Sequence, residues 1–166
     1  MSTHCLVIKM NSDGSIDAIY VHSDGYLSEA GRTLCEYYQD EKKINDLLNL
    51  GDLSFIGPVP KSDPIMWEEN YSKPPYDEYC RAYKDRGENT PKKHYSADTP
   101  IQKVIKDYDY DIYNYLWVDG EWFLLEYVFT NPAVDWTKRF GVYELKYNPG
   151  DNEPDRKWLG WAPDIN

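Results

Sequence analysis

The chain has 166 residues, of which 29 are acidic and 18 are basic, so its formal net charge is −11. This length suits one domain with a buried core, and the 16 Tyr and 6 Trp residues supply large side chains for that core. A charge of this size and sign repels nucleic acid and anionic membranes, which leaves two interpretations: solubility alone, or a partner that normally binds a polyanion.

The N-terminal segment predicts a β-hairpin. Two short apolar runs, Cys5–Met10 and Ile16–Val21, flank a loop of Asn, Ser, Asp and Gly residues in which Gly14 can take a positive φ. The hairpin is expected to cover residues 4–22.

Two short helices are expected next. Ser28 is predicted to cap the first helix, whose apolar stripe includes Leu34 and Tyr38. Asp40 is predicted to cap the second helix, and Gly51 to stop it.

The segment from residue 57 to residue 100 differs in composition from the rest of the chain. It contains seven of the 11 prolines and many polar residues, which predicts a long, largely irregular insertion with one helical turn at residues 76–83. Its second half is locally basic. The sequence Lys92-Lys93-His94-Tyr95 is either a solvated loop or a place where a phosphate or nucleotide could be held.

The C-terminal part predicts a second hairpin. Residues 100–106 are expected to form a short helix, and Asp119-Gly120 between two aromatic and β-branched runs predicts strands over residues 112–118 and 121–129. A further strand is expected at residues 141–147, with Trp158 and Trp161 of the tail packing back onto the sheet. The predicted fold is a single α+β domain over residues 1–166. Its antiparallel sheet is built from an N-terminal and a C-terminal hairpin, with two or three short helices between them.

The corner between the first hairpin and the first helix contains candidate binding residues. His22 and Asp24 would share a face of a continuing strand, and Asp24 could then orient the imidazole. A ligand site here would add Tyr26 and Arg32, the latter as an anion holder at the start of the helix. The alternative is a structural corner in which Asp24 makes the turn and Tyr26 packs.

Residues 107–137 contain seven carboxylates and no Lys or Arg. In an extended chain, Asp107, Asp109 and Asp111 would lie about 6.6–6.8 Å apart on one face, which is close to the repeat of phosphates along a nucleic acid. This pattern favours either a phosphate-like surface for a nucleic-acid-binding protein or a solvated edge strand whose charges block strand pairing. The aromatic residues that would anchor a partner on such a surface are Tyr108, Tyr110 and Tyr113.

Motifs for catalysis or metal binding are absent from the sequence. The three histidines have no metal-binding spacing, and there is no phosphate-binding glycine loop and no G-x-S-x-G nucleophile. Cys5, Cys35 and Cys80 are odd in number and form no C-x-x-C pair, which suits a reducing cytosol. With no secretory signal and no membrane-spanning run, we expect a cytoplasmic protein that is not an enzyme and that binds no metal, cofactor or membrane.

Residues 19–56 resemble a group of small proteins from bacteriophage and prophage genomes. The matching features are a Tyr-containing strand at Tyr20, an H-x-D-G-Y corner at 22–26, a G-x-x-L helix at 31–34 and an L-x-x-L-G-D-[IL]-S segment at 47–54. Members often have tryptophan where this chain has Ser23. The resemblance implies a bacterial host cytoplasm, in which small acidic proteins without catalytic motifs often inhibit host defence.

Two hypotheses follow from these patterns. The first is a non-enzymatic acidic protein that inhibits a host factor, such as a nuclease or a CRISPR-type complex, through contacts at Asp107–Asp111. The second is a small-ligand protein, expected as a homo-oligomer, that sequesters a nucleotide signal at the His22–Tyr26 corner with Arg32.

Overall fold

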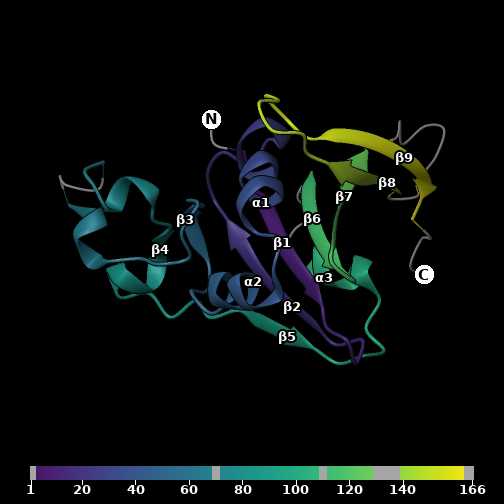
Figure 1. The fold of residues 1–166 in the computed structure, drawn as a ribbon. Helices are drawn as coiled ribbons and strands as arrows, with labels where there is room; N and C mark the ends of the chain where they lie inside the picture. Colours follow the sequence, from purple (N-terminus) through teal and green to yellow (C-terminus); the bar gives the residue numbers. More distant parts are fainter. Residues whose placement is uncertain (1–2, 69–71, 109–111, 129–138, 163–166) are drawn as a thin grey trace.

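The computed structural model describes residues 3–68, 72–108, 112–128 and 139–162. Within these residues nine strands form one sheet in the order β4-β3-β2-β1-β6-β7-β8-β9, with β5 beside β2 (Figure 1). Three α-helices accompany the sheet, so the predicted α+β class is confirmed. The strands are β1 (Cys5–Met10), β2 (Ile16–Val21), β3 (Leu53–Phe55), β4 (Arg81–Ala82), β5 (Lys93–Tyr95), β6 (Tyr113–Val118), β7 (Glu121–Val128), β8 (Arg139–Lys146) and β9 (Asp155–Trp161). The helices are α1 (Arg32–Tyr37), α2 (Glu41–Leu48) and α3 (Ile101–Asp107).

Both predicted hairpins are confirmed. β1 pairs antiparallel with β2, and β6 pairs antiparallel with β7. Asp119 and Gly120 in the second turn have φ of 48° and 82°, the positive values that a two-residue type I′ turn requires. The two hairpins meet through parallel pairing of β1 with β6, and β2 also pairs parallel with β3. The sheet is therefore mostly, and not wholly, antiparallel.

The first helical segment begins earlier than the sequence suggested. A π-helical turn, η1 (Leu27–Gly31), leads directly into α1, and its N-cap position is Tyr26. Asp24 has φ of 59°, and its carbonyl oxygen accepts a hydrogen bond from the N–H of Ala30 at 3.0 Å. Because this bond starts the turn before Ser28, the prediction of Ser28 as the cap was wrong.

The second helix is capped as predicted. The carboxylate of Asp40 accepts a hydrogen bond from the backbone N–H of Lys43 at 2.8 Å. Gly51 follows the helix with φ of 76°, and its N–H donates to the carbonyl oxygen of Leu48 at 3.0 Å. The two signals read from the sequence therefore set the ends of α2.

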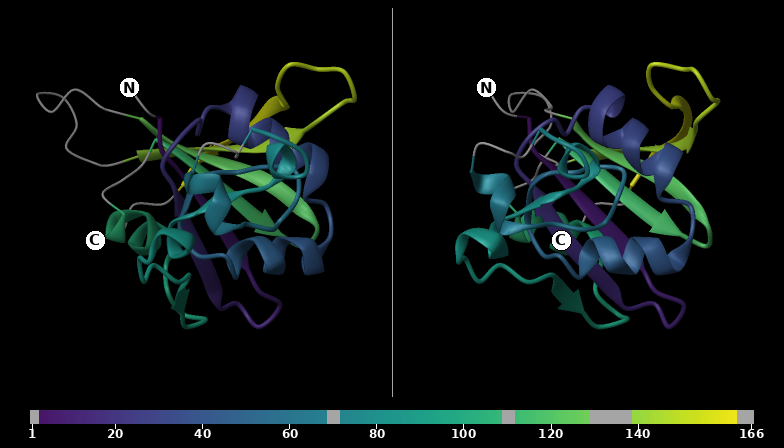
Figure 2. Two further views of the ribbon diagram at one scale, coloured as in Figure 1. Left: turned by 90° about the vertical axis from the view of Figure 1, so that its left-hand side faces the viewer. Right: turned by 60° about the vertical axis from the view of Figure 1, so that its left-hand side comes forward.

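Each face of the sheet has its own core. α1 and α2 cover one face with buried residues that include Leu34 and Leu47, and α3 covers the other with Val104 and Ile105. Figure 2 (left) shows α2 and α3 on opposite sides of β1 and β2. Since β1 is covered on both faces, its residues 5–8 form a continuous apolar run, and the buried Lys9 that follows is paired with Glu41 of α2.

The segment 57–100 contains short regular elements. Its described residues form three single-turn 3₁₀ helices, η2 (Pro64–Trp67), η3 (Tyr76–Glu78) and η4 (Tyr83–Arg86), and the strands β4 and β5, which join the sheet on either side of η4 in the sequence. The indole of Trp67 donates to the carbonyl oxygen of Ala82 at 2.9 Å. The guanidinium groups of Arg81 and Arg86 lie 3.9 and 4.5 Å from the centre of the Trp67 ring. Cation–π contacts thus hold part of this Pro-rich segment together.

The C-terminal part extends the sheet beyond the second hairpin. β8 contains most of the strand predicted at residues 141–147, and the tail returns as β9, antiparallel to β8. The indole of Trp158 lies edge-on to Tyr143 with ring centroids 5.2 Å apart, so the predicted packing of the tail is confirmed for Trp158, although both Trp158 and Trp161 stay about half exposed. Among the described helices, none has both the length and the apolar character needed to cross a bilayer.

Candidate functional site at the edge of the sheet

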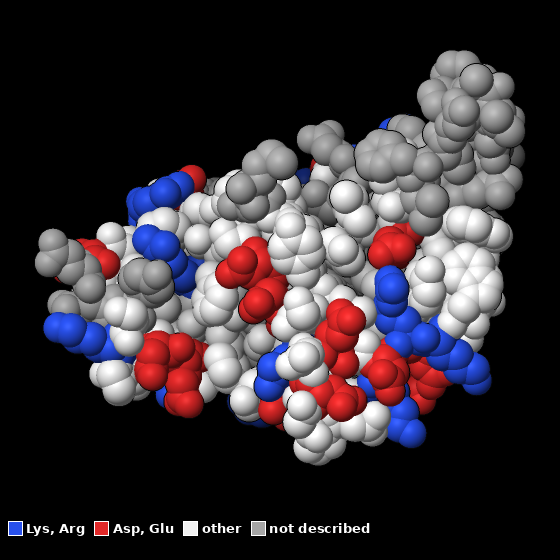
Figure 3. Space-filling model, turned by 90° about the horizontal axis from the view of Figure 1, so that it is seen from above, with Lys and Arg blue, Asp and Glu red and all other residues white. Residues whose placement is uncertain are grey.

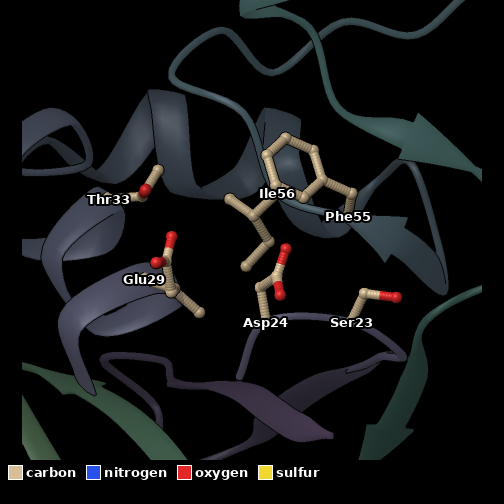
Figure 4. Close-up of a pocket in the computed structure, with 7 residues that line it drawn as sticks. Ser23, Asp24, Glu29, Thr33, Phe55 and Ile56 are labelled. Atoms are coloured by element: carbon tan, nitrogen blue, oxygen red, sulfur yellow. The ribbon is translucent and has the colours of Figure 1, made fainter. Parts of the chain in front are cut away.

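The predicted corner site separates into two parts. His22 lies against His4 and Tyr20, whereas Asp24 faces a small cavity beneath Ile56. Figure 4 shows the carboxylates of Asp24 and Glu29 pointing into this cavity. Its volume is about 30 Å³, whereas sites for small organic ligands have roughly 300–1,000 Å³. The corner cavity is therefore too small for a nucleotide.

Arg32 and Tyr26, the other predicted members of the corner site, face different neighbours. The Nε of Arg32 lies 3.5 Å from the carboxylate of Glu36, and its guanidinium lies 6.0 Å from the ring of Tyr147. Tyr26 is an exposed ring that meets Tyr113 edge-on, with centroids 6.0 Å apart. The structure thus brings together Tyr26 and Tyr113, which the sequence analysis had placed in separate sites.

His22 belongs to a compact cluster with His4 and Tyr20. The Nδ1–H of His4 donates to the carbonyl oxygen of His22 at 2.7 Å, because a carbonyl oxygen can only accept. The hydroxyl of Tyr20 lies 2.8 Å from Nδ1 of His4 and 2.9 Å from Nδ1 of His22. Burial, and next the neighbouring His4, lower the pKa of His22. These two imidazoles and one phenol fix the end of the first hairpin.

The predicted acidic row is only partly within the described residues. Asp109, Tyr110 and Asp111 lie outside them. Asp107 ends α3, so the extended chain expected at this residue is wrong, and its carboxylate accepts from the hydroxyl of Tyr95 at 3.1 Å. Tyr108 stacks on Tyr20 with ring centroids 6.5 Å apart, and burial raises its pKa well above the usual value. Tyr108 is therefore a packing residue, and not an exposed anchor.

Charges of both signs are mixed on one face of the described residues. Figure 3 shows Lys and Arg interspersed with Asp and Glu on the face seen from above. Glu126, a member of the one-sign stretch, pairs with Arg156 of β9 at 3.3 Å, although the two residues are far apart in the sequence. Strand pairing thus supplies basic neighbours that the linear sequence does not.

The predicted basic loop forms strand β5, and its cations face partners within the chain. Nδ1 of His94 lies 2.7 Å from the buried carboxylate of Asp17, and Nζ of Lys92 lies 3.8 Å from the same group. Nζ of Lys93 lies 4.3 Å from the ring of Tyr108. These contacts join β5 to β2 and α3.

The cysteine thiols are poor nucleophiles. All three cysteines are free and buried. Burial raises the pKa of Cys35 to about 12 and that of Cys80 to about 11. Because the thiolate is the reactive form, neither thiol suits covalent catalysis. Within the described part of the chain, no three His, Cys, Asp or Glu side chains gather as a metal site.

A group of aromatic side chains gathers on the outer part of the sheet. The strand registers place Tyr113, Glu126, Gly141 and Trp161 in one row across β6, β7, β8 and β9. The next row ends in Tyr143 opposite Trp158. Since residues opposite one another in a register share a face, these rings lie on the face that α1 covers farther in. We call this group the aromatic face; its members are Tyr26, Tyr113, Tyr143, Trp158 and Trp161.

The aromatic face is unusually open for side chains of this size. Tyr26, Trp158 and Trp161 have exposed fractions of 47%, 46% and 49%, and Leu159, the extra residue at the bulge of β9, has 50%. The indoles of Trp158 and Trp161 meet edge-on at 5.1 Å. A Cβ atom at Gly141 would lie 2.8 Å from Cζ3 of Trp158, so only glycine leaves room for this indole against β8. Trp158 is therefore held in place while half of it stays in solvent.

The side chain of Arg156 crosses the aromatic face. The guanidinium of Arg156 lies 5.1 Å from the ring of Tyr143 and reaches the carboxylate of Glu126. Trp, Tyr and Arg are the residue types that dominate binding energy in protein interfaces. From the sequence, Trp158 and Trp161 were expected to pack on the sheet and were not predicted as binding residues. Six of the seven residues of β9 are exposed, so its two indoles are available to bind a partner.

Comparison with protein-family models, with curated proteins and with solved structures finds no match for this chain.

Proposed function

We propose that this chain is a non-enzymatic binding protein that docks a protein partner on the aromatic face. The observation that supports the proposal best is the exposure of Trp158 and Trp161, side by side on β9. Burying an aromatic side chain of this kind contributes about 1.5–3 kcal/mol, so leaving two of them half in solvent forgoes stability that a partner can recover.

A protein is the class of partner that fits this surface. Exposed aromatic rings can also stack on the bases of single-stranded nucleic acid, but such sites lie in basic grooves. A chain with a net charge of −11 repels a polyanion. The same charge speeds association with a basic partner.

The partner we propose is a host factor that itself binds nucleic acid, such as a nuclease or a CRISPR-type complex in the bacterial cytoplasm. Such a factor has a basic surface, which complements the acidic chain. The resemblance of residues 19–56 to phage and prophage proteins favours this biological setting. By covering the basic surface, the chain would inhibit the factor without any chemical step. The acidic row of Asp107, Asp109 and Asp111 would add long-range electrostatic attraction to the basic surface of the partner.

The proposal is tested by measuring partner affinity in variants of β9. A partner captured from bacterial lysate and then purified should bind Trp158→Ala and Trp161→Ala at least about tenfold more weakly than the wild type. Leu159→Ala removes an equally exposed side chain that is not aromatic from the bulge of the same strand, and it should change the dissociation constant less than about twofold. Binding of the wild type should weaken as salt rises. If all three variants bound the partner as tightly as the wild type does, the aromatic face would be excluded as the docking surface.

The second hypothesis, a protein that sequesters a nucleotide signal, has no such support. The corner cavity holds about 30 Å³, and Arg32 is close to Glu36. The cations of the Lys92–Tyr95 stretch contact Asp17 and Tyr108.

A further inference from the structure

Strands β7 and β8 separate at one end of the sheet. Their antiparallel register begins at Phe123 opposite Glu144, although β7 starts at Glu121 and β8 continues to Lys146. Beyond this point β7 stays paired with β6, and β8 stays paired with β9. Both views in Figure 2 show the ends of β7 and β8 diverging here.

The separation opens a groove. It has a volume of about 480 Å³, which lies within the range of protein sites that hold a ligand. Trp117 and Trp122 lie at its base, edge-on to each other with ring centroids 5.4 Å apart. Residues from the other side of the groove are Cys35, Gln39, Leu145 and Tyr147. The base is therefore apolar and aromatic.

The walls of the groove are two strand edges. If the register continued, Trp122 would face Leu145 and Glu121 would face Lys146, but no described residues pair across this gap. Backbone N–H and C=O groups on such edges need hydrogen-bond partners. An extended peptide can satisfy both edges at once, and its alternate side chains would enter the aromatic base.

We propose that the groove between β7 and β8 binds an extended, basic segment of a protein partner by adding it as a strand. A basic segment fits because Glu121 and Glu144 outnumber Lys146 along the groove, in a chain whose net charge is −11. The identity of the ligand as a protein rests on the proposed function, but neither Trp158 nor Trp161 lines the groove. The two sites can therefore be tested separately.

The first test is a selection of random peptides of about seven residues, close to the usual length of a strand, on the wild-type protein. Gln39 is exposed, so Gln39→Trp fills the groove without disturbing the core. Leu159→Trp adds the same indole to an exposed position of β9 and is the matched control. Selected peptides should be rich in Lys, Arg and β-branched residues. Their dissociation constants should rise at least about tenfold on Gln39→Trp and stay unchanged on Leu159→Trp.

The second test distinguishes strand addition from a side-chain pocket. A selected peptide methylated on alternate backbone nitrogens keeps its side chains but loses the donors of one edge, so its affinity should fall at least about tenfold. The unmodified peptide should slow amide exchange at Trp122 and Leu145. Equal binding of the methylated peptide, or a selection that yields no peptide sensitive to Gln39→Trp, would overturn the proposal. If the Trp158→Ala variant still binds the peptide, the groove remains a peptide site even when the partner is found not to dock on the aromatic face.

Discussion

Replacing Tyr38 by Phe removes one buried hydroxyl and should destabilise the fold. The hydroxyl donates to the carbonyl oxygen of Gly57 at 2.7 Å, and it lies 3.6 Å from Sγ of Cys80. Tyr38 has no exposed surface, so no water can replace the lost donor without rearrangement. The contact joins the end of α1 to the start of the Pro-rich segment. Tyr38 therefore fixes that segment to the core.

The size of the effect follows from the groups left behind. A buried acceptor that loses its donor costs about 1–3 kcal/mol. The thiol of Cys80 lies 3.6 Å from the same carbonyl oxygen and can act as a weak substitute donor, which favours the lower part of this range. We expect the free energy of unfolding to fall by about 1–2 kcal/mol, and the melting temperature to fall by roughly 2–8 °C for a chain of this size.

The assay is urea unfolding followed by tryptophan fluorescence, with Tyr37→Phe as the matched control. Tyr37 is the preceding residue and is exposed, so loss of its hydroxyl should change the free energy of unfolding by less than about 0.5 kcal/mol. A loss below about 0.5 kcal/mol for Tyr38→Phe, or equal losses for the two variants, would refute the reasoning about the Gly57 contact.

Three further predictions concern the aromatic face and the titrating groups. Gly141→Ala should displace the indole of Trp158, because the new Cβ would lie 2.8 Å from its Cζ3 atom. The affinity for the partner should therefore fall, whereas calorimetry should show that the free energy of unfolding changes by less than about 1 kcal/mol. The lowered pKa of His22 means that the unfolded chain binds the proton more readily, so stability should fall as pH drops below about 6.5. Urea titrations across this range should show a smaller fall in His22→Gln, and an unchanged slope would contradict the role of the cluster. Although burial raises the pKa of Asp17, its hydrogen bonds to His94 and Asn11 lower it overall, so the stability it contributes is present above about pH 4 and lost below. Asp17→Asn should therefore weaken stability at pH 7 and flatten its dependence on acid; an acid profile like that of the wild type would argue against this.

Local signals in the sequence predicted much of the fold. The hairpin turns at Gly14 and at Asp119-Gly120, and the cap at Asp40, depend on neighbouring residues, and each is found where the sequence placed it. The parallel pairing of β1 with β6 joins residues about a hundred positions apart, and no local pattern encodes it. Strands as short as β4 give too little periodicity to be recognised.

The candidate site was predictable in part. The first hairpin already places His4 opposite His22, since Cys5 pairs with Val21, so the imidazole cluster could have been found from the predicted register. The exposure of Trp158 could not have been predicted, because large aromatic residues in a strand usually indicate a core. It depends on the position of β9 at the end of the sheet order, a property of the topology.

The most direct test of the proposed function is a fluorine NMR spectrum of the chain labelled with 5-fluorotryptophan, recorded with and without its purified partner. Docking on the aromatic face should shift or broaden the resonances of Trp158 and Trp161, assigned by single substitutions. Trp67, which lies among arginines in the Pro-rich segment, should be unaffected. A complex that leaves the two β9 resonances unchanged would contradict the proposal that this face binds the partner.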